Sequence, residues 1–366
     1  MMARIGYDFR AIASLQKSGV EKYILQVADL VPRKMPDSTF YFFVDASASR
    51  SQFKEYTGKN VKVIRIPTVA EKRFWYLVKI ITRLLKIDLF HFPLGIMPVA
   101  LTCKTIINIH DLTYEKRPEF YEDWEVELQK TMVPKAARQC DKILTISNAT
   151  SIDIQKFYKI TPDKITVIYP PVDVTTDNQV VFDLSKKEQY FIAIGNVQPR
   201  KNFPKIAESL KYLDANIKLY IIGKIQDKNQ EALIKNVVKE NKLEHRVNVT
   251  GYLSNAELKK IYNHATGLVF ASIYEGFGYP IIEAFSAGLP VITSRGSSTE
   301  EVAGSAAIIV DPDSERQIAD AMKMLTNSTT ARHDYIAKGR ARYKELSRLD
   351  FGKEVAGVYQ EVLGEK

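Results

Sequence analysis

The sequence predicts an α/β protein made of two doubly wound, parallel-sheet domains. Three observations support this fold class. At 366 residues the chain is long for a single hydrophobic core. Short apolar segments rich in β-formers alternate with helical patterns along the chain. The alternation breaks once, where Pro170 and Pro171 precede a run of Asp and Thr residues typical of an interdomain linker.

The first domain is expected over residues 1–172, followed by the linker at 173–186. A helix is predicted from Ser18-Gly19-Val20 to about Val31, because apolar residues recur there at helical spacing. Ser147 is a suitable cap for a helix that starts at Asn148. The strands of this domain are predicted at residues 5–7, 39–44, 61–66, 88–92, 105–109, 142–146 and 164–168.

The second domain is expected over residues 187–346, where the alternation restarts. Its helices are predicted from about Phe203, at 229–240, 255–264 and 280–287, and as two more before the end. Its strands are predicted at 190–194, 217–222, 247–250, 267–272, 290–293 and 307–310. A last helix at 351–363, within the final segment 347–366, carries Val355, Val358, Tyr359 and Val362 on one face.

The composition is that of a soluble globular protein, with 45% hydrophobic and 26% charged residues. A net charge of +9 suggests an anionic partner: nucleic acid, a lipid surface or a phosphorylated small molecule. The two cysteines, Cys103 and Cys140, adjoin apolar strands and are expected to be buried free thiols in a reducing compartment. No apolar leader and no run of 18 apolar residues occurs, so neither a signal peptide nor a spanning helix is expected.

The segment from Lys72 to Ile87 predicts a basic amphipathic helix. Such a pattern is typical of a helix that lies on anionic lipid. The alternative is an ordinary helix that packs on the core and exposes a solvated basic face, and both hold if only the charged face meets phospholipid. On a helical wheel one face carries Lys72, Lys79, Arg83 and Lys86, and the opposite face carries Phe74, Leu77, Val78, Ile81 and Leu85.

The densest cluster of chemistry-bearing residues runs from Glu275 to Glu283, between a buried strand and a helix. Gly276 and Gly278 allow a sharp turn and a close approach of the backbone to a ligand. The start of the following helix favours phosphate, and the two carboxylates suit sugar hydroxyls. A diphosphate with a sugar at each end fits this layout better than an ordinary turn with solvated glutamates does.

A second cluster, Gly195-Asn196-Val197-Gln198-Pro199-Arg200-Lys201-Asn202, also follows a strand and precedes a helix. Arg200 offers a bidentate fork and Lys201 a point charge, a pair suited to holding a diphosphate. A solvated Arg-Lys pair is the alternative, which the position at the carboxyl end of a strand disfavours.

Two features of the first domain lie at the same kind of sheet edge. Gly19 stands where a loop enters a helix, without the G-x-G-x-x-G fingerprint, so a plain helix-start glycine is an equally good interpretation. His110-Asp111 follows a strand, where His110 can bond a sugar hydroxyl or exchange a proton, and a loop-closing His–Asp pair is the alternative. Metal and covalent chemistry are not expected, because the five His are scattered and no Cys-x-x-Cys, G-x-S-x-G or Walker motif occurs.

With these motifs in view, the chain resembles family-four retaining glycosyltransferases of the GT-B fold over nearly its whole length, and its mannosyltransferases in particular. The EGFGYPIIE segment matches the family's Glu-x7-Glu motif, and residues 195–202 resemble its diphosphate loop. His110-Asp111 and Gly19 match acceptor-domain positions of the family. The resemblance implies two Rossmann-like domains that face a cleft, an N-terminal acceptor domain and a C-terminal nucleotide-sugar domain. It also implies that helix 351–363 packs back on the first domain.

The resemblance implies a role for each matching residue. Glu283 is expected to hold the donor ribose, and Glu275 with the amides of Phe277 and Gly278 the transferred sugar. Arg200 and Lys201 are expected to neutralise the departing diphosphate, and His110 to lie near the reacting carbon. The remaining donor-binding positions it implies are Gly19, Asn196, Tyr252, Leu253, Gly276, Tyr279 and Ile281, and it places Asp111 beside His110 in the catalytic group.

Two departures from the family pattern occur. Asn196 stands where many members have Arg, so Arg200 is expected to supply that charge, and the glycine pair near position 19 is reduced to Ser18-Gly19. A front-side attack that retains the anomeric configuration is expected, since no well-placed nucleophile is evident. In this scheme fixed cations and helix amides stabilise the leaving group, and neither a metal nor another cofactor is required.

The sequence therefore predicts a cytoplasmic enzyme, peripheral on the inner face of a membrane, that extends a lipid-linked bacterial glycan such as O-antigen or lipopolysaccharide. GDP-mannose is the first-choice donor, with UDP-hexoses and dTDP-rhamnose as further candidates. Two alternatives are a nucleotide-sugar epimerase of the same fold and a nucleotide-sugar-binding module. Nucleic-acid binding is not favoured, because aromatic and basic residues do not alternate on any predicted sheet face.

Overall fold

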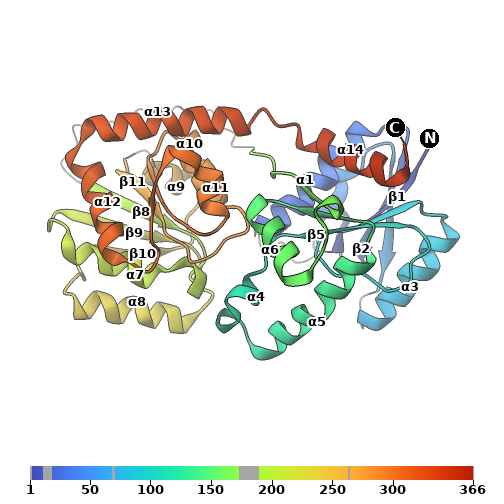
Figure 1. The fold of residues 1–366 in the computed structure, drawn as a ribbon, viewed down its shortest axis with the longest axis horizontal. Coiled ribbons are helices and arrows are strands. Elements are labelled where there is room, and N and C mark those ends of the chain that lie inside the picture. Colours follow the sequence, from blue (N-terminus) through green and yellow to red (C-terminus); the bar gives the residue numbers. More distant parts are fainter. Residues whose placement is uncertain (1, 11–18, 68–70, 173–188, 263, 366) are drawn as a thin grey trace. The chain divides into compact units, whose positions relative to one another are not determined.

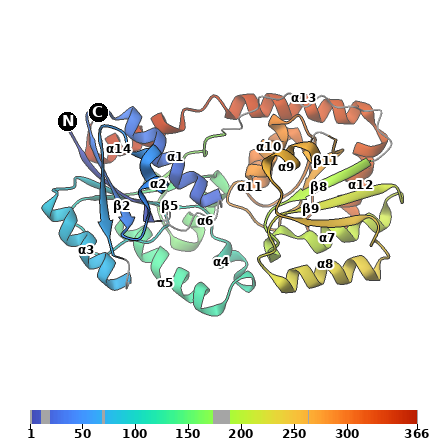
Figure 2. The ribbon, with the colours of Figure 1, turned by 180° about the vertical axis from the view of Figure 1, so that it is seen from behind.

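The computed structural model describes residues 2–10, 19–67, 71–172, 189–262 and 264–365, and the predicted linker at 173–186 lies outside them. The contacts divide the chain into two units. Unit 1 comprises Met1–Pro171 and Leu349–Lys366, and unit 2 comprises Val172–Arg348. The corresponding predicted boundaries are residues 172 and 346. Each unit is a parallel sheet with helices on both faces, as Figures 1 and 2 show.

Unit 1 contains a seven-stranded parallel sheet in the order β3-β2-β1-β4-β5-β6-β7. The chain progresses in one direction from β1 to β3 and in the other from β4 onward, so a topological switch point lies between β1 and β4. The strands are β1 (Arg4–Asp8), β2 (Thr39–Asp45), β3 (Val61–Ile66), β4 (Leu89–Phe92), β5 (Lys104–Ile109), β6 (Lys142–Thr145) and β7 (Ile165–Val167).

Unit 2 contains a six-stranded parallel sheet in the order β10-β9-β8-β11-β12-β13, with its switch point between β8 and β11. Helices α7, α8 and α12 cover one face, where the apolar core of this unit gathers, and α10 and α13 pack together on the other. The strands are β8 (Gln189–Ile194), β9 (Ile217–Ile222), β10 (Val247–Gly251), β11 (Gly267–Phe270), β12 (Val291–Ser294) and β13 (Ala307–Val310).

The helices lie close to their predicted positions where the apolar periodicity is strong. Ser147 caps α6 as predicted, and its Oγ accepts a hydrogen bond from the Thr150 amide at 3.1 Å. The longer helices are α1 (Gly19–Lys34), α3 (Glu71–Leu84), α5 (Asp123–Gln139), α6 (Asn148–Tyr158), α8 (Lys228–Glu240), α9 (Asn255–Tyr262), α10 (Tyr279–Ser286), α12 (Glu315–Asn327), α13 (Thr329–Leu346) and α14 (Phe351–Leu363). Four short ones are α2 (Arg50–Phe53), α4 (Thr113–Lys116), α7 (Phe203–Glu208) and α11 (Ser298–Ala303).

Helix α14 belongs to unit 1 although it follows all of unit 2 in sequence. Gly352 lets it approach α1 so closely that a Cβ there would lie 3.1 Å from the Cβ of Leu30. Tyr359 is buried, and its hydroxyl lies 2.6 Å from Nδ1 of His91 on β4. The prediction that the last helix packs back on the first domain is therefore confirmed.

A buried polar chain continues from His91 into the sheet. Its Nε2 lies 2.5 Å from Oδ1 of Asn108, whose Nδ2 donates to the Tyr23 hydroxyl at 2.9 Å. This orientation of the amide makes His91 Nε2 the donor and leaves Nδ1 to accept from Tyr359. Burial lowers the pKa of His91 to about 3, although the bond to Asn108 acts in the opposite direction.

Helix α3 packs its apolar face inward as an ordinary core helix does. Phe74 and Val78 are buried in the core of unit 1, and the Arg10 guanidinium lies 3.6 Å from the centre of the Phe74 ring. The helix ends at Leu84, so its predicted extension to Ile87 is wrong. The chain turns at Lys86, which adopts a φ of 50° and closes the helix terminus.

The two cysteines differ in burial. Cys140 is a buried free thiol, whereas Cys103 is free but only partly buried, because β5 begins beside it at the amino edge of the sheet. Burial raises the pKa of Cys103 to about 11 and that of Cys140 to about 12.

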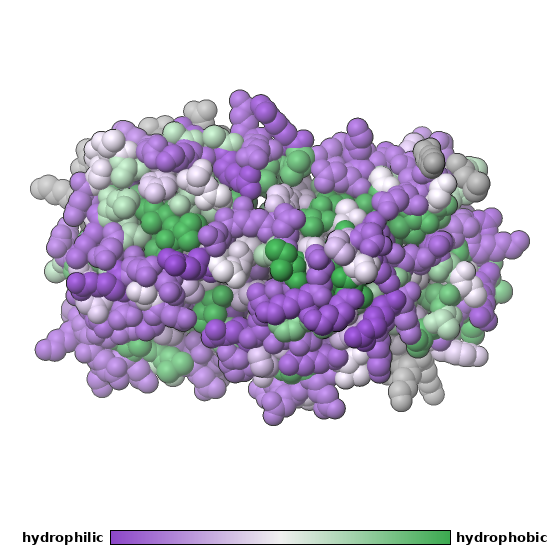
Figure 3. Space-filling model, viewed as in Figure 1, coloured by the Kyte–Doolittle hydropathy of each residue, from purple (hydrophilic) through white to green (hydrophobic). Residues whose placement is uncertain are grey.

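No described helix is both long and apolar enough to span a bilayer. Most of the face in Figure 3 is hydrophilic, with apolar residues in small separate groups.

Candidate active site

Two loops of unit 2 meet at the switch point of its sheet. One follows β8 and contains Arg200 and Lys201, and the other follows β11 and contains Glu275. The amide of Ile273 donates to the carbonyl of Arg200 at 2.8 Å, which ties the two loops together. Asn202, held in a left-handed conformation, donates from Nδ2 to the carbonyl of Ala271 at 3.1 Å. Ligands of doubly wound sheets bind at this carboxyl edge.

Arg200, Lys201 and Glu275 form one ion cluster, which unites residues that lie about 75 positions apart. Lys201 Nζ lies 2.6 Å from Oε1 of Glu275, and Arg200 pairs with the other carboxylate oxygen. Lys201 and Glu275 are only 8% and 7% exposed. Burial would raise the pKa of Glu275, but the two cations hold it at about 2. The cluster therefore carries a fixed net positive charge at neutral pH.

Glycines make room for this cluster. The Lys201 side chain passes over Gly195, where a Cβ would come within 2.9 Å of Lys201 Cε. Gly223, at the end of β9, lies against the same loop, and a Cβ there would lie 1.9 Å from the carbonyl oxygen of Gly195. The loop that carries the cations can therefore adopt this position only if glycine occupies both sites.

Replacing Gly223 by Ala should destabilise unit 2 by about 1–3 kcal/mol, because the added methyl group forces the backbone of the 195–202 loop to move. Gly251→Ala is the matched control. Its φ is +72° and a Cβ there meets no atom within 4 Å, so it should cost only the left-handed strain of about 1 kcal/mol. Scanning calorimetry of both variants tests this, and equal losses would contradict the steric argument.

The turn before α10 presents backbone amides beside the ion cluster. Gly278 adopts a φ of 105° and is the N-cap, with no side chain to cap the helix. The hydroxyl of Ser298 donates to the carbonyl of Glu275 at 2.7 Å and fixes the start of the turn. The helix begins at Tyr279, one residue before the prediction, and places Pro280 in its first turn. The helix start therefore adds partial positive charge to the site.

The other predicted donor-binding residues fall into two groups. Gly276, Phe277 and Ile281 are buried around the turn, and Tyr279 packs its ring 5.5 Å from that of Phe277. Asn196 and Glu283 are partly buried. Tyr252 and Leu253 follow β10, the edge strand of the sheet, and Tyr252 is 70% exposed. Their proposed contacts with a nucleotide remain predictions.

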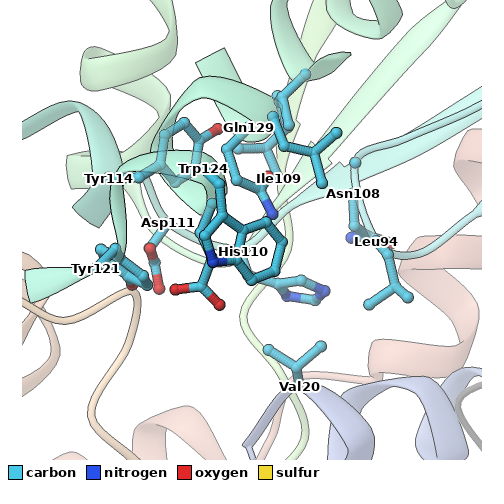
Figure 4. A pocket seen from close by; sticks show the side chains of 14 residues that line it. Val20, Leu94, Asn108, Ile109, His110, Asp111, Tyr114, Tyr121, Trp124 and Gln129 are labelled. Atoms are coloured by element: carbon cyan, nitrogen blue, oxygen red, sulfur yellow. The ribbon is translucent and has the colours of Figure 1, made fainter. Parts of the chain in front are cut away.

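His110 and Asp111 lie in unit 1, directly after β5, and line a pocket of about 340 Å³ (Figure 4). His110 Nε2 lies 2.8 Å from the carbonyl oxygen of Pro93, to which it donates. Burial lowers the pKa of His110, and that bond and the Asp111 charge act in the opposite direction. Gly19, the exposed first residue of α1, precedes Val20, which also lines the pocket.

The outer wall of this pocket was not predicted from the sequence. That wall is formed by Tyr121 and by α5, whose residues Trp124, Glu125, Leu128 and Gln129 line it. A parallel crossover from β5 to β6 requires an intervening helix, which was an available signal. The helix was hard to recognise because Pro134 lies inside it and most of its side chains are polar or charged.

The described residues contain no group of three or more His, Cys, Asp or Glu side chains arranged to hold a metal ion. The cations identified at the unit 2 site are those of Arg200 and Lys201.

Two open parallel sheets with the same Rossmann-like strand order are the architecture of GT-B proteins. A solved glycosyltransferase from Rickettsia africae aligns over 100% of this chain and 99% of its own with a TM-score of 0.74 and 17% identity. The fold class predicted from the sequence is thus confirmed.

The chain belongs to the group 1 glycosyltransferases of family 4. The family described as Glycosyl transferases group 1 matches residues 174–342, and Glycosyltransferase Family 4 matches residues 17–176. The O-antigen chain mannosyltransferase RfbU of Salmonella typhimurium is 30% identical over 245 residues, covering 66% of this chain and 67% of that protein. A Campylobacter jejuni N-acetylgalactosaminyltransferase, named for a diphospho-undecaprenol substrate, is 21% identical over 344 residues, 91% and 90% of the two chains.

Proposed function

We propose that this glycosyltransferase is a retaining mannosyltransferase that uses GDP-mannose and extends a glycan, free or lipid-linked, in bacterial surface polysaccharide synthesis. The observation that carries the proposal is the Arg200–Lys201–Glu275 cluster beside the start of α10. A nucleoside diphosphate leaving group gains negative charge as the sugar departs, and fixed cations with backbone amides stabilise that charge. The mannosyl donor and glycan acceptor are supported by the names of the relatives.

In this proposal the donor binds on unit 2 and the acceptor on unit 1. Arg200 and Lys201 hold the diphosphate, Glu283 binds the ribose, and the turn at 275–278 binds the transferred sugar. Since the protein supplies the cations at the leaving group, we expect transfer to continue after treatment with a chelator.

The test is sugar transfer from GDP-mannose, UDP-glucose, UDP-galactose and dTDP-rhamnose to an undecaprenyl-diphosphate-linked glycan, with and without chelator. Transfer from GDP-mannose, with an α-linkage in the product by NMR, is the expected result. A thermal-shift panel of GDP, UDP and dTDP identifies the nucleotide independently. Exclusive use of a UDP-sugar would refute the donor assignment, and an epimerised nucleotide sugar formed without acceptor would refute transfer itself.

We also propose that α3 contacts an anionic membrane surface. Its outward face carries Lys79 and Arg83. The same face carries three exposed apolar side chains, those of Tyr76, Ile80 and Leu84. The exposed fractions of these three are 66%, 38% and 76%, so this face combines charge with apolar area that can enter the headgroup region.

Reversing both charges, Lys79→Glu with Arg83→Glu, should weaken binding to vesicles that contain phosphatidylglycerol roughly tenfold or more, because each basic group contributes about 1 kcal/mol near such a surface. Lys239→Glu, an exposed position on α8 of unit 2, is the control and should bind as the wild type does. Vesicle sedimentation measures both. Equal retention by the two variants would exclude α3 as the contact.

A further inference from the structure

The pocket beside His110 combines aromatic rings in solvent with a set of hydrogen-bond acceptors. Trp124 is 64% exposed and Tyr121 is 37% exposed, both on its rim. Figure 4 shows Tyr114 and Tyr121 on one side of the pocket, Leu94 on the other and the Trp124 ring between them. A large ring held in water at the mouth of a pocket provides a flat apolar surface that a ligand can cover.

The position of Trp124 is fixed by the start of α5. Glu122 is the N-cap, and its amide donates to Oε2 of Glu125 at 3.3 Å in a capping box. Trp124 lies in the first turn, between these two residues. The ring is thus mounted on a capped helix rather than on a loose loop, and Glu125 keeps a carboxylate at the pocket wall.

The charged groups of the pocket, the carboxylates of Asp111 and Glu125, accept hydrogen bonds and do not donate them. Since His110 Nε2 donates to Pro93, its Nδ1 carries a lone pair, and that buried atom has no hydrogen-bond partner among the described residues. Asp111 Oδ1 accepts from the amide and hydroxyl of Thr113, at 3.0 and 2.7 Å, which holds the carboxylate at the pocket. Asp111 and Glu125 therefore provide two carboxylate acceptors at the pocket wall, which suit a ligand that carries hydroxyl donors.

The charge of the pocket excludes anionic ligands. No Lys or Arg occurs among the residues that line it in the described part of the chain, and Asp111 and Glu125 repel phosphates and carboxylates. A neutral pyranose satisfies all of these requirements. Its hydroxyls donate to the acceptors, and its C–H face covers an aromatic ring.

We propose that Trp124 is the stacking platform of a saccharide subsite that binds a neutral pyranose of the acceptor, with Asp111 and Glu125 accepting its hydroxyls. The identification of this sugar as part of the acceptor rests on the proposed function, whereas the presence of a saccharide subsite does not. It separates the acceptor's sugar from its diphosphate, which must bind elsewhere because this pocket lacks cations.

Fluorescence tests binding without any transfer reaction. The chain contains two tryptophans, so Trp75→Phe leaves Trp124 as the single reporter. Methyl α-mannopyranoside and methyl α-glucopyranoside should shift its emission saturably, whereas glucuronate and mannose 6-phosphate should not. No shift with either neutral glycoside, an equal shift with the charged sugars, or a shift produced only by lipid vesicles would overturn the proposal.

Kinetics then test the role in transfer. Trp124→Ala should raise the acceptor KM about three- to tenfold, and Trp124→Phe should restore most of that loss, with the donor KM unchanged in both. Leu233→Ala, an exposed apolar side chain on α8, is the control and should leave the acceptor KM unchanged. An unchanged KM in Trp124→Ala would refute the platform. If the wild type transfers no sugar at all, the proposed function fails, and the fluorescence result stands by itself.

Discussion

Replacing Lys201 by Met should lower the rate of sugar transfer by about 10²- to 10³-fold, the loss that follows removal of one preorganised charge at a developing anion. Lys201 is the more buried of the two cations of the cluster, and its Nζ also lies 4.6 Å from the centre of the Phe270 ring. Methionine is unbranched and one heavy atom shorter than lysine, so it fills most of the same space without the charge. Because the leaving group gains charge only as the sugar departs, we expect most of the loss in kcat.

Lys205→Met is the matched control. Lys205 lies one turn further along the chain and pairs with Glu208 and Glu315, at 3.2 and 3.3 Å, outside the cluster. Its replacement should leave kcat close to that of the wild type. Steady-state transfer with the natural donor measures both variants, and circular dichroism confirms that both are folded. A Lys201→Met enzyme with undiminished kcat would remove this cation from the reaction.

Lowering the pH below about 6.5 should destabilise unit 1 through His91. Folding lowers the pKa of this imidazole from 6.5 to about 3, so between these values the unfolded chain binds a proton that the folded chain does not. The free energy of unfolding should then fall by about 1.4 kcal/mol for each pH unit on acidification. His110, whose pKa is also lowered by burial, acts in the same direction. Glu275 lies in unit 2 and destabilises that unit only below pH 4.5, because its pKa is 4.5 in the unfolded chain and about 2 in the folded chain.

Urea unfolding at pH 7.5, 6.5 and 5.5 measures this dependence. Trp75 and Trp124 both lie in unit 1, so tryptophan emission follows the unit that contains His91. His91→Gln keeps an acceptor for Tyr359 and a donor for Asn108 without a titrating group. The unfolding free energy of this variant should depend on pH less steeply, because unfolding then takes up one proton fewer. The same slope in both proteins would contradict the assignment.

The fold was predictable because nearly all strands are short apolar runs that a parallel sheet buries on both faces. Strands Ile217–Ile222 and Ala307–Val310 and helix Phe351–Leu363 lie where the sequence places them. The errors in the predicted elements occur where the apolar pattern is weak or where a single backbone angle determines the end of a helix. Helix α5 was missed because Pro134 and many polar residues obscure it. The end of α3 was misplaced because no residue near it indicates that the backbone of Lys86 adopts a left-handed conformation.

The sequence predicted which loops form the candidate site, but it did not predict which side chains pair within it. Arg200, Lys201 and Glu275 each follow a predicted strand, and carboxyl ends of parallel strands share an edge. That both oxygens of Glu275 bind these cations depends on the strand order, which places β8 beside β11. The polar chain from Tyr359 to Asn108 could not be predicted either, because Tyr359 lies 268 positions after His91, and His91 and Asn108 belong to no motif.

The placement of α14 has a consequence for biosynthesis. Residues 172–348 are translated between the two pieces of unit 1, so unit 2 is complete on the ribosome before its neighbour can close. Until Phe351, Val355 and Tyr359 emerge, the apolar surfaces of α1 and β4 that they cover stay open to water. The nascent amino-terminal half therefore exposes this apolar surface until α14 has been made.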